Sequence, residues 1–81
     1  MTPYAVDDSA LWADTRTAST PEWMQTSAKE KIEALRAMSD PRKAGGAFMN
    51  RWLYPFGKFQ LSCRIDDARR IVFVLRIVQL P

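Results

Sequence analysis

Lys58-Phe-Gln-Leu-Ser-Cys-Arg-Ile-Asp66 decides the fold of this chain, together with the stretch Asp67-Ala-Arg-Arg-Ile-Val-Phe-Val-Leu-Arg-Ile-Val78 that follows it. Apolar and polar residues alternate strictly in the first stretch, as they do in a strand with one buried face. The run from Arg70 to Val78 is almost continuously apolar, which is typical of a strand covered on both faces. The residues from Asp66 to Arg69 favour a tight turn. The sequence therefore predicts a β-hairpin over residues 59–79.

A helix is predicted upstream of this hairpin. Ser19 or Thr20 can cap it, Pro21 suits its first turn, and Asp40-Pro41 ends it because the residue before a proline avoids the helical region. We interpret Trp23, beside the apolar stripe, as a lid on the core rather than a binding anchor. The apolar stripe recurs at helical spacing and the opposite, charged face is interpreted as solvated; the stripe is Met24, Ala28, Ile32, Leu35 and Met38, and the charged face is Lys29, Glu30, Glu33 and Arg36.

The remaining segments complete a small α+β fold. Pro3 to Val6 favours a short strand, Ala10 to Ala18 a first helix, and Phe48 to Tyr54 a strand that Pro55-Phe-Gly57 turns into the hairpin, with a connector from Arg42 to Gly46. We therefore predict two N-terminal helices packed on a small, mainly antiparallel sheet of three to four strands, forming one domain over residues 1–81.

Composition restricts the chemistry. The chain has 81 residues, a net charge of +3 and no histidine. Basic charge is compatible with nucleic-acid or acidic partners, whereas the missing histidine removes the commonest general base and zinc ligand. Cys63 lies on the apolar face of the predicted strand, so we interpret it as a core residue. We predict no catalytic residue, metal or cofactor.

No part of the sequence predicts membrane insertion. The longest apolar run, Ile71 to Leu75, is far shorter than the roughly 20 residues that a membrane span requires, and the N-terminus has no basic segment followed by an apolar one. We expect a cytoplasmic protein.

Five segments of the sequence are similar, in order and spacing, to a known family. They are Ser39-Asp-Pro-Arg-Lys43, Arg51-Trp-Leu-Tyr54, Gly57-Lys-Phe-Gln-Leu61, Arg64-Ile-Asp-Asp67 and Val74-Leu-Arg-Ile-Val-Gln-Leu80. This series resembles the RelE/ParE superfamily of type II toxin–antitoxin toxins and covers the chain from about Ile32 to Leu80. The resemblance implies the RelE/ParE-like fold and an antitoxin-like partner.

The resemblance also implies altered activity. In the RelE branch, cleavage of mRNA on the ribosome is carried by basic side chains of the sheet, and this chain has Gln60 and Leu80 at two such positions. Loss of a guanidinium that stabilises phosphoryl transfer costs orders of magnitude in rate. The ParE branch acts by protein contact through a basic C-terminal tail that has no counterpart here. We therefore expect a toxin-type protein that is weak or inactive as a ribonuclease.

Two classes of function stay open at this point, together with a question of assembly. The first is RNA or ribosome binding, with Lys58 and Arg64 expected on the same strand face as Gln60. The second is a non-catalytic inhibitor or anti-defence protein, such as one carried by a phage, that binds a target protein through aromatic residues. A homodimer through an exposed edge, either the strand near Tyr54 or the terminal strand, is a further expectation. The candidate RNA or partner contacts are Arg42, Lys43, Arg51, Lys58, Gln60, Arg64 and Arg76, and the aromatic candidates are Trp23, Trp52 and Tyr54.

Overall fold

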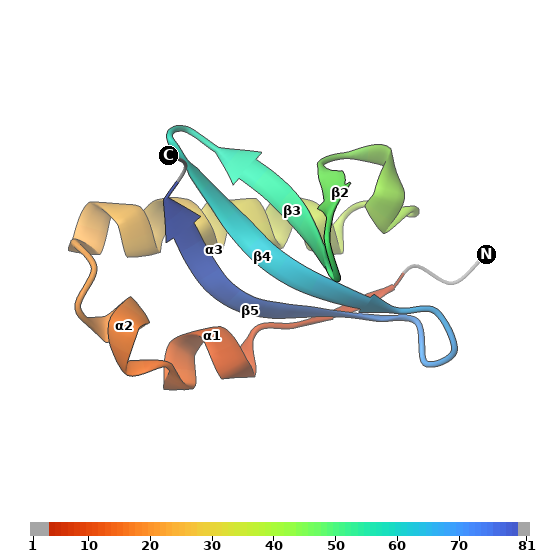
Figure 1. Cartoon of the computed structure of the whole chain (residues 1–81), viewed down its shortest axis with the longest axis horizontal. Helices are drawn as coiled ribbons and strands as arrows, with labels where there is room; N and C mark the ends of the chain where they lie inside the picture. The colour runs from red at the N-terminus through yellow and green to blue at the C-terminus, as the bar shows by residue number, and fades with distance from the viewer. Residues whose placement is uncertain (1–3, 80–81) are drawn as a thin grey trace.

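A mostly antiparallel sheet with helices on one side forms the fold (Figure 1). The computed structural model describes residues 4–79. Within that range the strand order is β1-β5-β4-β3-β2, and only the β1–β5 pair is parallel. The strands are β1 (Ala5–Asp7), β2 (Gly46–Phe48), β3 (Arg51–Phe56), β4 (Phe59–Asp66) and β5 (Ile71–Gln79). The predicted α+β class is confirmed, with five strands in place of three to four.

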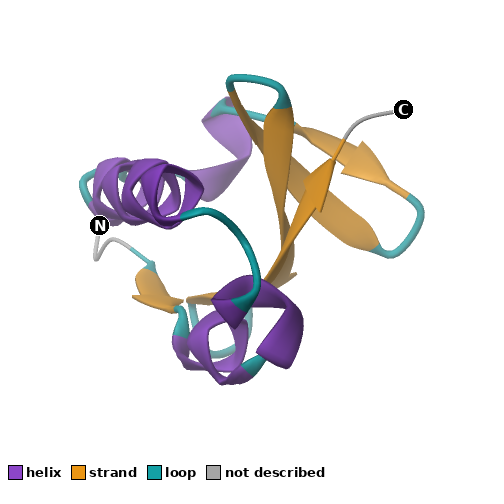
Figure 2. Ribbon diagram, turned by 90° about the vertical axis from the view of Figure 1, so that its left-hand side faces the viewer, coloured by secondary structure: helices purple, strands orange, loops and turns teal. Residues whose placement is uncertain are grey.

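Helices cover a single face of the sheet. The long helix α3 (Glu22–Arg36) lies behind the strands in Figure 1, whereas α1 (Ser9–Ala13) and α2 (Thr15–Ala18) lie beside β5. Figure 2 shows that the strands have no helix on their other side. The predicted first helix is divided at Asp14, whose extended backbone lets its side chain accept a hydrogen bond from the amide of Arg16.

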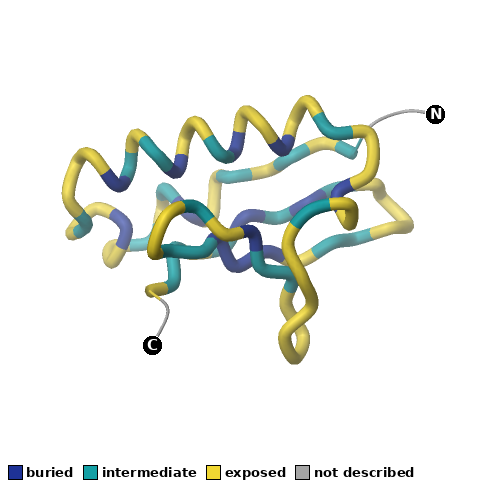
Figure 3. The backbone as a smooth tube through the Cα atoms, turned by 90° about the horizontal axis from the view of Figure 1, so that it is seen from above, coloured by how far each residue is buried: buried dark blue, intermediate teal, exposed yellow. Residues whose placement is uncertain are grey.

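The stripe of α3 is buried as the sequence predicted. Met24, Ala28, Ile32 and Leu35 are buried against the sheet, and the buried positions recur along the tube of Figure 3. The helix ends at Arg36, before the predicted Asp40-Pro41 boundary, and Asp40 instead caps a 3-10 turn, η1 (Pro41–Lys43). The sequence predicted the buried face of the helix correctly but not its end. The helical spacing of apolar residues continues to Met38, which packs on the core although it lies beyond the end of the helix.

The predicted hairpin is confirmed as β4 and β5. Leu61, Cys63, Val72 and Val74 face α3 and are fully or almost fully buried. Burial raises the pKa of the Cys63 thiol to about 12, which keeps it protonated and agrees with its interpretation as a core residue. A β-bulge interrupts the ladder: Ser62 pairs with Arg76 and Cys63 with Val74, so Leu75 has no partner on β4.

The strand predicted from Phe48 to Tyr54 is present as β3, but it begins later, at Arg51, because Met49 and Asn50 form a two-residue turn between β2 and β3. Met49 adopts a φ of 55°, a region that few residues other than glycine and asparagine favour. Pro55 also lies inside β3 and not in the following turn. It is tolerated because β2 pairs only as far as Leu53, which leaves no partner on that side of Pro55.

The two edges of the sheet differ from those expected. The Tyr54 strand, β3, lies between β2 and β4, and the terminal strand, β5, lies between β1 and β4. This pairing is partial, because β2 reaches only as far as Leu53 on β3 and β1 reaches only as far as Phe73 on β5. The remaining parts of both strands lack a partner on that side, so a homodimer through either of them stays a prediction. The edges are the three-residue strands β1 and β2, which fits the short edge strands that limit unwanted pairing.

Within the described residues, no helix has the length and apolar character that spanning a membrane requires. The predicted Pro3 strand residue and Leu80 lie outside the described range.

Candidate binding face of the sheet

The uncovered face of the sheet collects polar and basic side chains from three neighbouring strands. Because side chains alternate along a strand, the neighbours of the buried residues Tyr54, Leu61 and Cys63 point away from α3. On this open face β3 contributes Arg51 and Leu53, β4 contributes Gln60, Ser62 and Arg64, and β5 contributes Arg76 and Val78.

The open face has a hollow of about 540 Å³, which lies within the range of roughly 300–1,000 Å³ that is typical of ligand sites. Its rim is the β2–β3 turn, where Phe48 is 61% and Met49 is 89% exposed. Arg51 and Arg76 lie on its border with guanidinium groups on an otherwise largely apolar surface. The lining residues are Phe48, Met49, Arg51, Leu53, Gln60, Ser62, Arg76, Val78 and Gln79.

A second, shallower hollow of about 320 Å³ adjoins the first. Arg42, Arg51 and Arg64 all line it, so the arginines of β3 and β4 and of η1 meet around the β2–β3 turn. Met49 and Arg51 line both hollows. The two hollows together form a basic surface around an exposed apolar turn.

The arginines of this face form no salt bridge with a carboxylate in the described part of the chain, although Arg76 lies near enough to Asp14 to help lower the pKa of that carboxyl. Among residues 4–79, Arg51, Arg64 and Arg76 form no ion pair. Arg64 stacks over the ring of Phe73 at 5.6 Å, and Arg51 donates a hydrogen bond to the backbone oxygen of Asn50 at 3.2 Å. These contacts hold the guanidinium groups of Arg51 and Arg64 without cancelling their charge, so both groups can bind an anion.

Gln60 lies in the middle of the open face. Its amide oxygen is buried, and no donor within the described residues reaches it. A buried acceptor without a partner costs roughly 1–3 kcal/mol, so the Gln60 amide is a point where a bound donor would be favoured. Gln60 carries no charge, however, and cannot act as an acid or base.

Arg42 belongs to a different network from the one expected. Its guanidinium donates to both oxygens of Asp67, at 2.7 and 3.0 Å, and the hydroxyl of Tyr4 donates to the same carboxylate at 2.6 Å. These bonds hold the pKa of Asp67 below its ordinary value of 3.8, with the Arg42 bond as the largest cause. Arg42 therefore joins the turn after β4 to η1, and its charge is already paired.

This network predicts pH-dependent stability. Because the pKa of Asp67 is depressed in the folded state, its contribution is present at neutral pH and is lost as the pH falls through that depressed value. We expect Asp67→Asn to lower the free energy of unfolding at about pH 7, with the difference from the parent protein shrinking as the pH falls below 3.8, the ordinary pKa of the carboxyl. Urea unfolding across this pH range measures it.

The matched control is Glu30→Gln, which removes an exposed carboxylate that forms no ion pair within residues 4–79. If the two variants lose stability equally at every pH, the Asp67 network does not have the proposed effect.

Two of the aromatic candidates serve the interior. Tyr54 is fully buried and its hydroxyl donates to the backbone oxygen of Pro41 at 2.6 Å, so the expectation of a contact residue is wrong. Burial raises the pKa of this hydroxyl. Trp52 is half-buried, and its indole nitrogen donates to the backbone oxygen of Ala44 at 2.8 Å. Both rings fasten the chain around η1 to the sheet.

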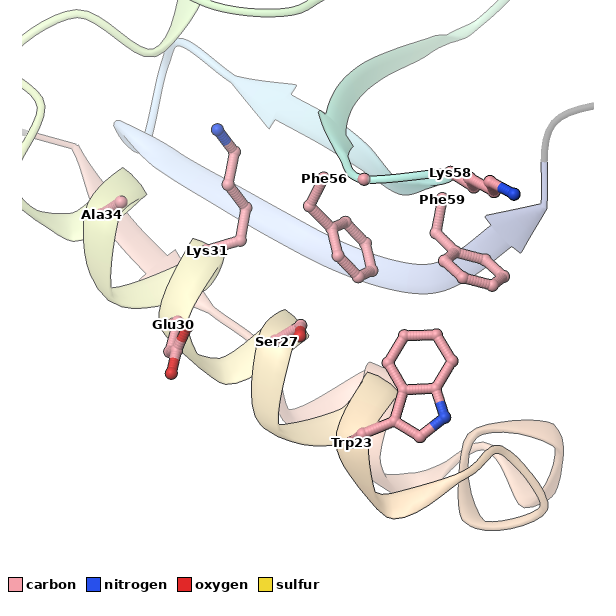
Figure 4. Close-up of a pocket in the computed structure, with 9 residues that line it drawn as sticks. Trp23, Ser27, Glu30, Lys31, Ala34, Phe56, Lys58 and Phe59 are labelled. Atoms are coloured by element: carbon pink, nitrogen blue, oxygen red, sulfur yellow. The ribbon is translucent and has the colours of Figure 1, made fainter.

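Trp23 and Lys58 lie away from the open face. Trp23 is 61% exposed, so its interpretation as a core lid is wrong. Lys58 belongs to the turn between β3 and β4 and, with Trp23, lines a groove beside α3 (Figure 4). The alternating pattern predicted that Lys58 shares a strand face with Gln60 and Arg64. That prediction is wrong, because Lys58 lies in the turn and lines the groove beside α3. Lys43 is exposed on η1.

The structure adds residues that sequence reasoning missed. Phe48, Met49, Leu53 and Val78 line the larger hollow, yet each was interpreted only as part of a strand or of its connector. The sequence did contain a signal for Leu53 and Val78. Side chains alternate along a strand, so a residue next to an inward-facing one is expected on the open face. No group of three or more acidic or cysteine side chains within residues 4–79 could hold a metal ion.

Comparison with known proteins finds matches among solved structures. No family model matches the sequence, and no curated protein does. One solved structure that matches is the RelBE2 toxin–antitoxin complex of Mycobacterium tuberculosis, with a TM-score of 0.76 and 22% sequence identity. The match covers 99% of this chain and 94% of the other.

The chain has a RelE-type toxin fold. The resemblance that the ordered sequence segments suggested is thereby confirmed at the level of the fold. Any function of this chain must therefore be explained with a RelE-type fold whose open face carries the neutral Gln60 and several arginines.

Proposed function

We propose that this chain is a toxin-type protein that binds single-stranded RNA, including ribosomal or messenger RNA in the cytoplasm, on the open face of its sheet, with little or no ribonuclease activity. The observation that carries the proposal is a set of three arginines that form no salt bridge within residues 4–79: Arg51 and Arg76 border the larger, apolar hollow, and Arg64 lines the hollow that adjoins it.

The chemistry of this face suits RNA. Guanidinium groups bind phosphate oxygens bidentately, and each such contact releases counterions from the RNA. Unstacked bases pack on apolar and aromatic side chains, which Phe48, Met49 and Leu53 supply beside the arginines. Single-stranded RNA presents phosphates and unstacked bases together, whereas the bases of a duplex are stacked and paired.

The same face lacks the groups that cut RNA efficiently. The chain has no histidine, and Gln60 is neutral. Cys63 is buried on the opposite side of the sheet, where its thiol stays protonated. Arginines can stabilise charge in a transition state, but cleavage also needs proton transfer to and from the reacting oxygens. Binding without turnover is therefore the expected outcome.

An antitoxin-like protein is part of the proposal. The structural relative is a complex of a toxin with its antitoxin, and a toxin-type protein that binds RNA requires such a partner to hold it inactive.

The test is RNA binding as a function of salt. We expect a fluorescent single-stranded RNA to bind with an affinity that falls as salt rises, and Arg51→Ala or Arg76→Ala to lower the slope of log K against log salt by about 0.7 each. Fluorescence anisotropy measures it. Arg69→Ala, in the exposed turn after β4, is the matched control and should leave the slope unchanged.

A second readout tests the lack of cleavage. After incubation with the protein, the RNA should remain intact, and expression without a partner should slow translation while mRNA stays full length. Salt-independent binding, an effect of Arg69→Ala equal to that of Arg51→Ala, or unimpaired translation would contradict the proposal.

One observation favours a second function, a non-catalytic inhibitor of a protein target. Phe48 and Met49 are exposed at the tip of the β2–β3 turn, and large exposed apolar side chains are typical of protein contacts. Affinity purification from host lysate distinguishes the two functions. Ribosomes or RNA support the first, whereas one stoichiometric protein that resists nuclease treatment supports the second.

A further inference from the structure

The larger hollow of the open face is mainly apolar, with a few polar groups at its floor and border. Leu53 and Val78 lie on its floor, on β3 and β5, and Phe48 and Met49 lie on its rim at the β2–β3 turn. Ligand sites typically combine an apolar lining with a small number of polar groups that fix the orientation of the ligand. This hollow of about 540 Å³ therefore has the composition of a small-molecule site as well as that of an RNA contact.

The amide oxygen of Gln60 needs a donor that its neighbours do not supply. Gln60 pairs with Pro55 on β3 and with Val78 on β5, and neither of these side chains carries a hydrogen-bond donor. The oxygen is buried, and no donor within the described residues reaches it. Because Gln60 lines the larger hollow, a bound molecule with an N–H group at this position supplies the missing hydrogen bond.

A guanidinium group borders the hollow close to this acceptor. Arg76 pairs with Ser62, and Ser62 is two positions from Gln60 on β4. Arg76 and Gln60 are therefore diagonal neighbours, which lie roughly 7–8 Å apart in a sheet. Arg76 forms no salt bridge within residues 4–79, and a guanidinium binds a carboxylate through two parallel hydrogen bonds. A small two-ring molecule with a carboxylate can thus reach both groups.

The rim of the hollow favours an aromatic ligand. Phe48 and Met49 are large apolar side chains that are exposed beside the floor. Aromatic rings pack on a phenyl ring in offset or edge-to-face geometry, and the thioether of methionine makes favourable contacts with ring edges. A flat ring therefore gains more from this rim than an aliphatic chain does.

We propose that the larger hollow binds a small, flat aromatic carboxylate that carries a ring N–H group. The carboxylate pairs with Arg76, the ring N–H donates to Oε1 of Gln60, and the ring packs against Phe48. Such a ligand covers the apolar surface on which RNA bases are proposed to pack, so the ligand and RNA compete for the open face. The site itself does not depend on RNA binding.

The test is a titration of the ¹⁵N-labelled protein with indole-3-acetate, which has a two-ring system, a carboxylate and a ring N–H. The matched ligand is benzofuran-3-acetate, in which an oxygen replaces the N–H in a ring system of the same shape. We expect indole-3-acetate to bind about tenfold more tightly, because it alone supplies a donor to the buried oxygen of Gln60. The amide resonances of Gln60, Arg76 and Val78 should shift, while those of Trp23 and Phe59 stay in place.

Two substitutions separate the contributions of the acceptor and the guanidinium. Gln60→Met removes the acceptor, so it should weaken indole-3-acetate binding to the level of the benzofuran and leave the benzofuran unchanged. Arg76→Met should weaken both ligands by about tenfold or more. The matched control is Lys58→Met, which removes one positive charge at the aromatic groove beside α3 and should bind both ligands as the parent protein does. The ¹⁵N spectra also show whether each variant is folded.

Four results would overturn the inference: no binding of either ligand, equal binding of both to the parent protein, shifts at Trp23 and Phe59 in place of the open face, or an equal loss of affinity in Lys58→Met and Arg76→Met. A protein that binds RNA but neither ligand keeps the proposed function and loses this inference. Binding of indole-3-acetate without RNA binding supports the inference and contradicts the proposed function. If both bind, indole-3-acetate should displace the RNA.

Discussion

Replacing Gly45 by alanine is expected to destabilise the protein by at least about 2 kcal/mol, which corresponds to a Tm lower by about 8–16 °C for a domain of this size. Gly45 has a φ of +72°, where an L-residue is strained. A Cβ atom there would also lie 2.1 Å from the backbone oxygen of Leu53 and 3.1 Å from the indole nitrogen of Trp52. Since backbone cannot rotate aside as a side chain can, β2 would have to move away from β3.

Two other glycines separate the causes of this effect. Gly46→Ala places its Cβ in open space, so it should cost little. Gly57→Ala also meets no atom but has a φ of +59°, so it should show the strain alone, about 1–2 kcal/mol. Thermal unfolding followed by circular dichroism ranks the three variants. A Gly45→Ala protein as stable as Gly57→Ala would show that the close approach to Leu53 is unimportant.

Truncation of Ile32 to alanine is expected to cost about 2–5 kcal/mol. Ile32 is 1% exposed and belongs to the cluster that joins α3 to the sheet, with Leu61 and Val74 among its members. The truncation removes buried methyl groups and leaves a cavity that a fold with one helix layer has little means of filling. A large part of the total stability, on the order of 5–15 kcal/mol, would be lost.

Guanidinium unfolding of Ile32→Ala beside Thr26→Ala provides the comparison. Thr26 lies on the exposed face of the same helix, so its truncation should change the free energy of unfolding by no more than about 0.5 kcal/mol. Similar losses in both variants would mean that helix propensity, rather than contact with the sheet, accounts for the effect.

The sequence predicted those helices and strands in which apolar residues recur at regular spacing because one side of the element is buried. Alternation located β4, and the stripe through Ile32 located the buried side of α3. The turn at Met49 was missed because neither Met49 nor Asn50 is followed by a glycine, and the positive φ of Met49 is imposed by pairing of Phe48 with Arg51. The extra edge strand β2 follows from that turn.

The candidate site was predictable only in part, for a different reason. Arg51, Gln60, Arg64 and Arg76 could be identified by their places in a resembling series, and the fold brings them to one face or its border. Pairing of a charge with a distant residue leaves no local trace. Arg42 is therefore indistinguishable in the sequence from an unpaired arginine, although 25 residues separate it from its partner Asp67.

The sequence also does not reveal whether an aromatic residue beside a helical apolar stripe is exposed or buried. Trp23 precedes the buried Met24 by one position, so a small rotation of α3 about its axis decides whether the ring covers the core or faces the groove. That rotation depends on how Phe56 and Phe59 fill the opposite wall, which is information from a part of the chain more than thirty residues away.

The bulge at Leu75 affects how β5 can be matched to other sequences. Because this residue is surplus to the ladder, Val74 and Ile77 both face α3 while Arg76 between them faces outward. Comparison with an unbulged strand consequently needs a one-position gap at Leu75. Without that gap, Arg76 is set opposite core positions and every later residue is compared with the wrong face of its counterpart, so similarity at the end of the chain is underestimated.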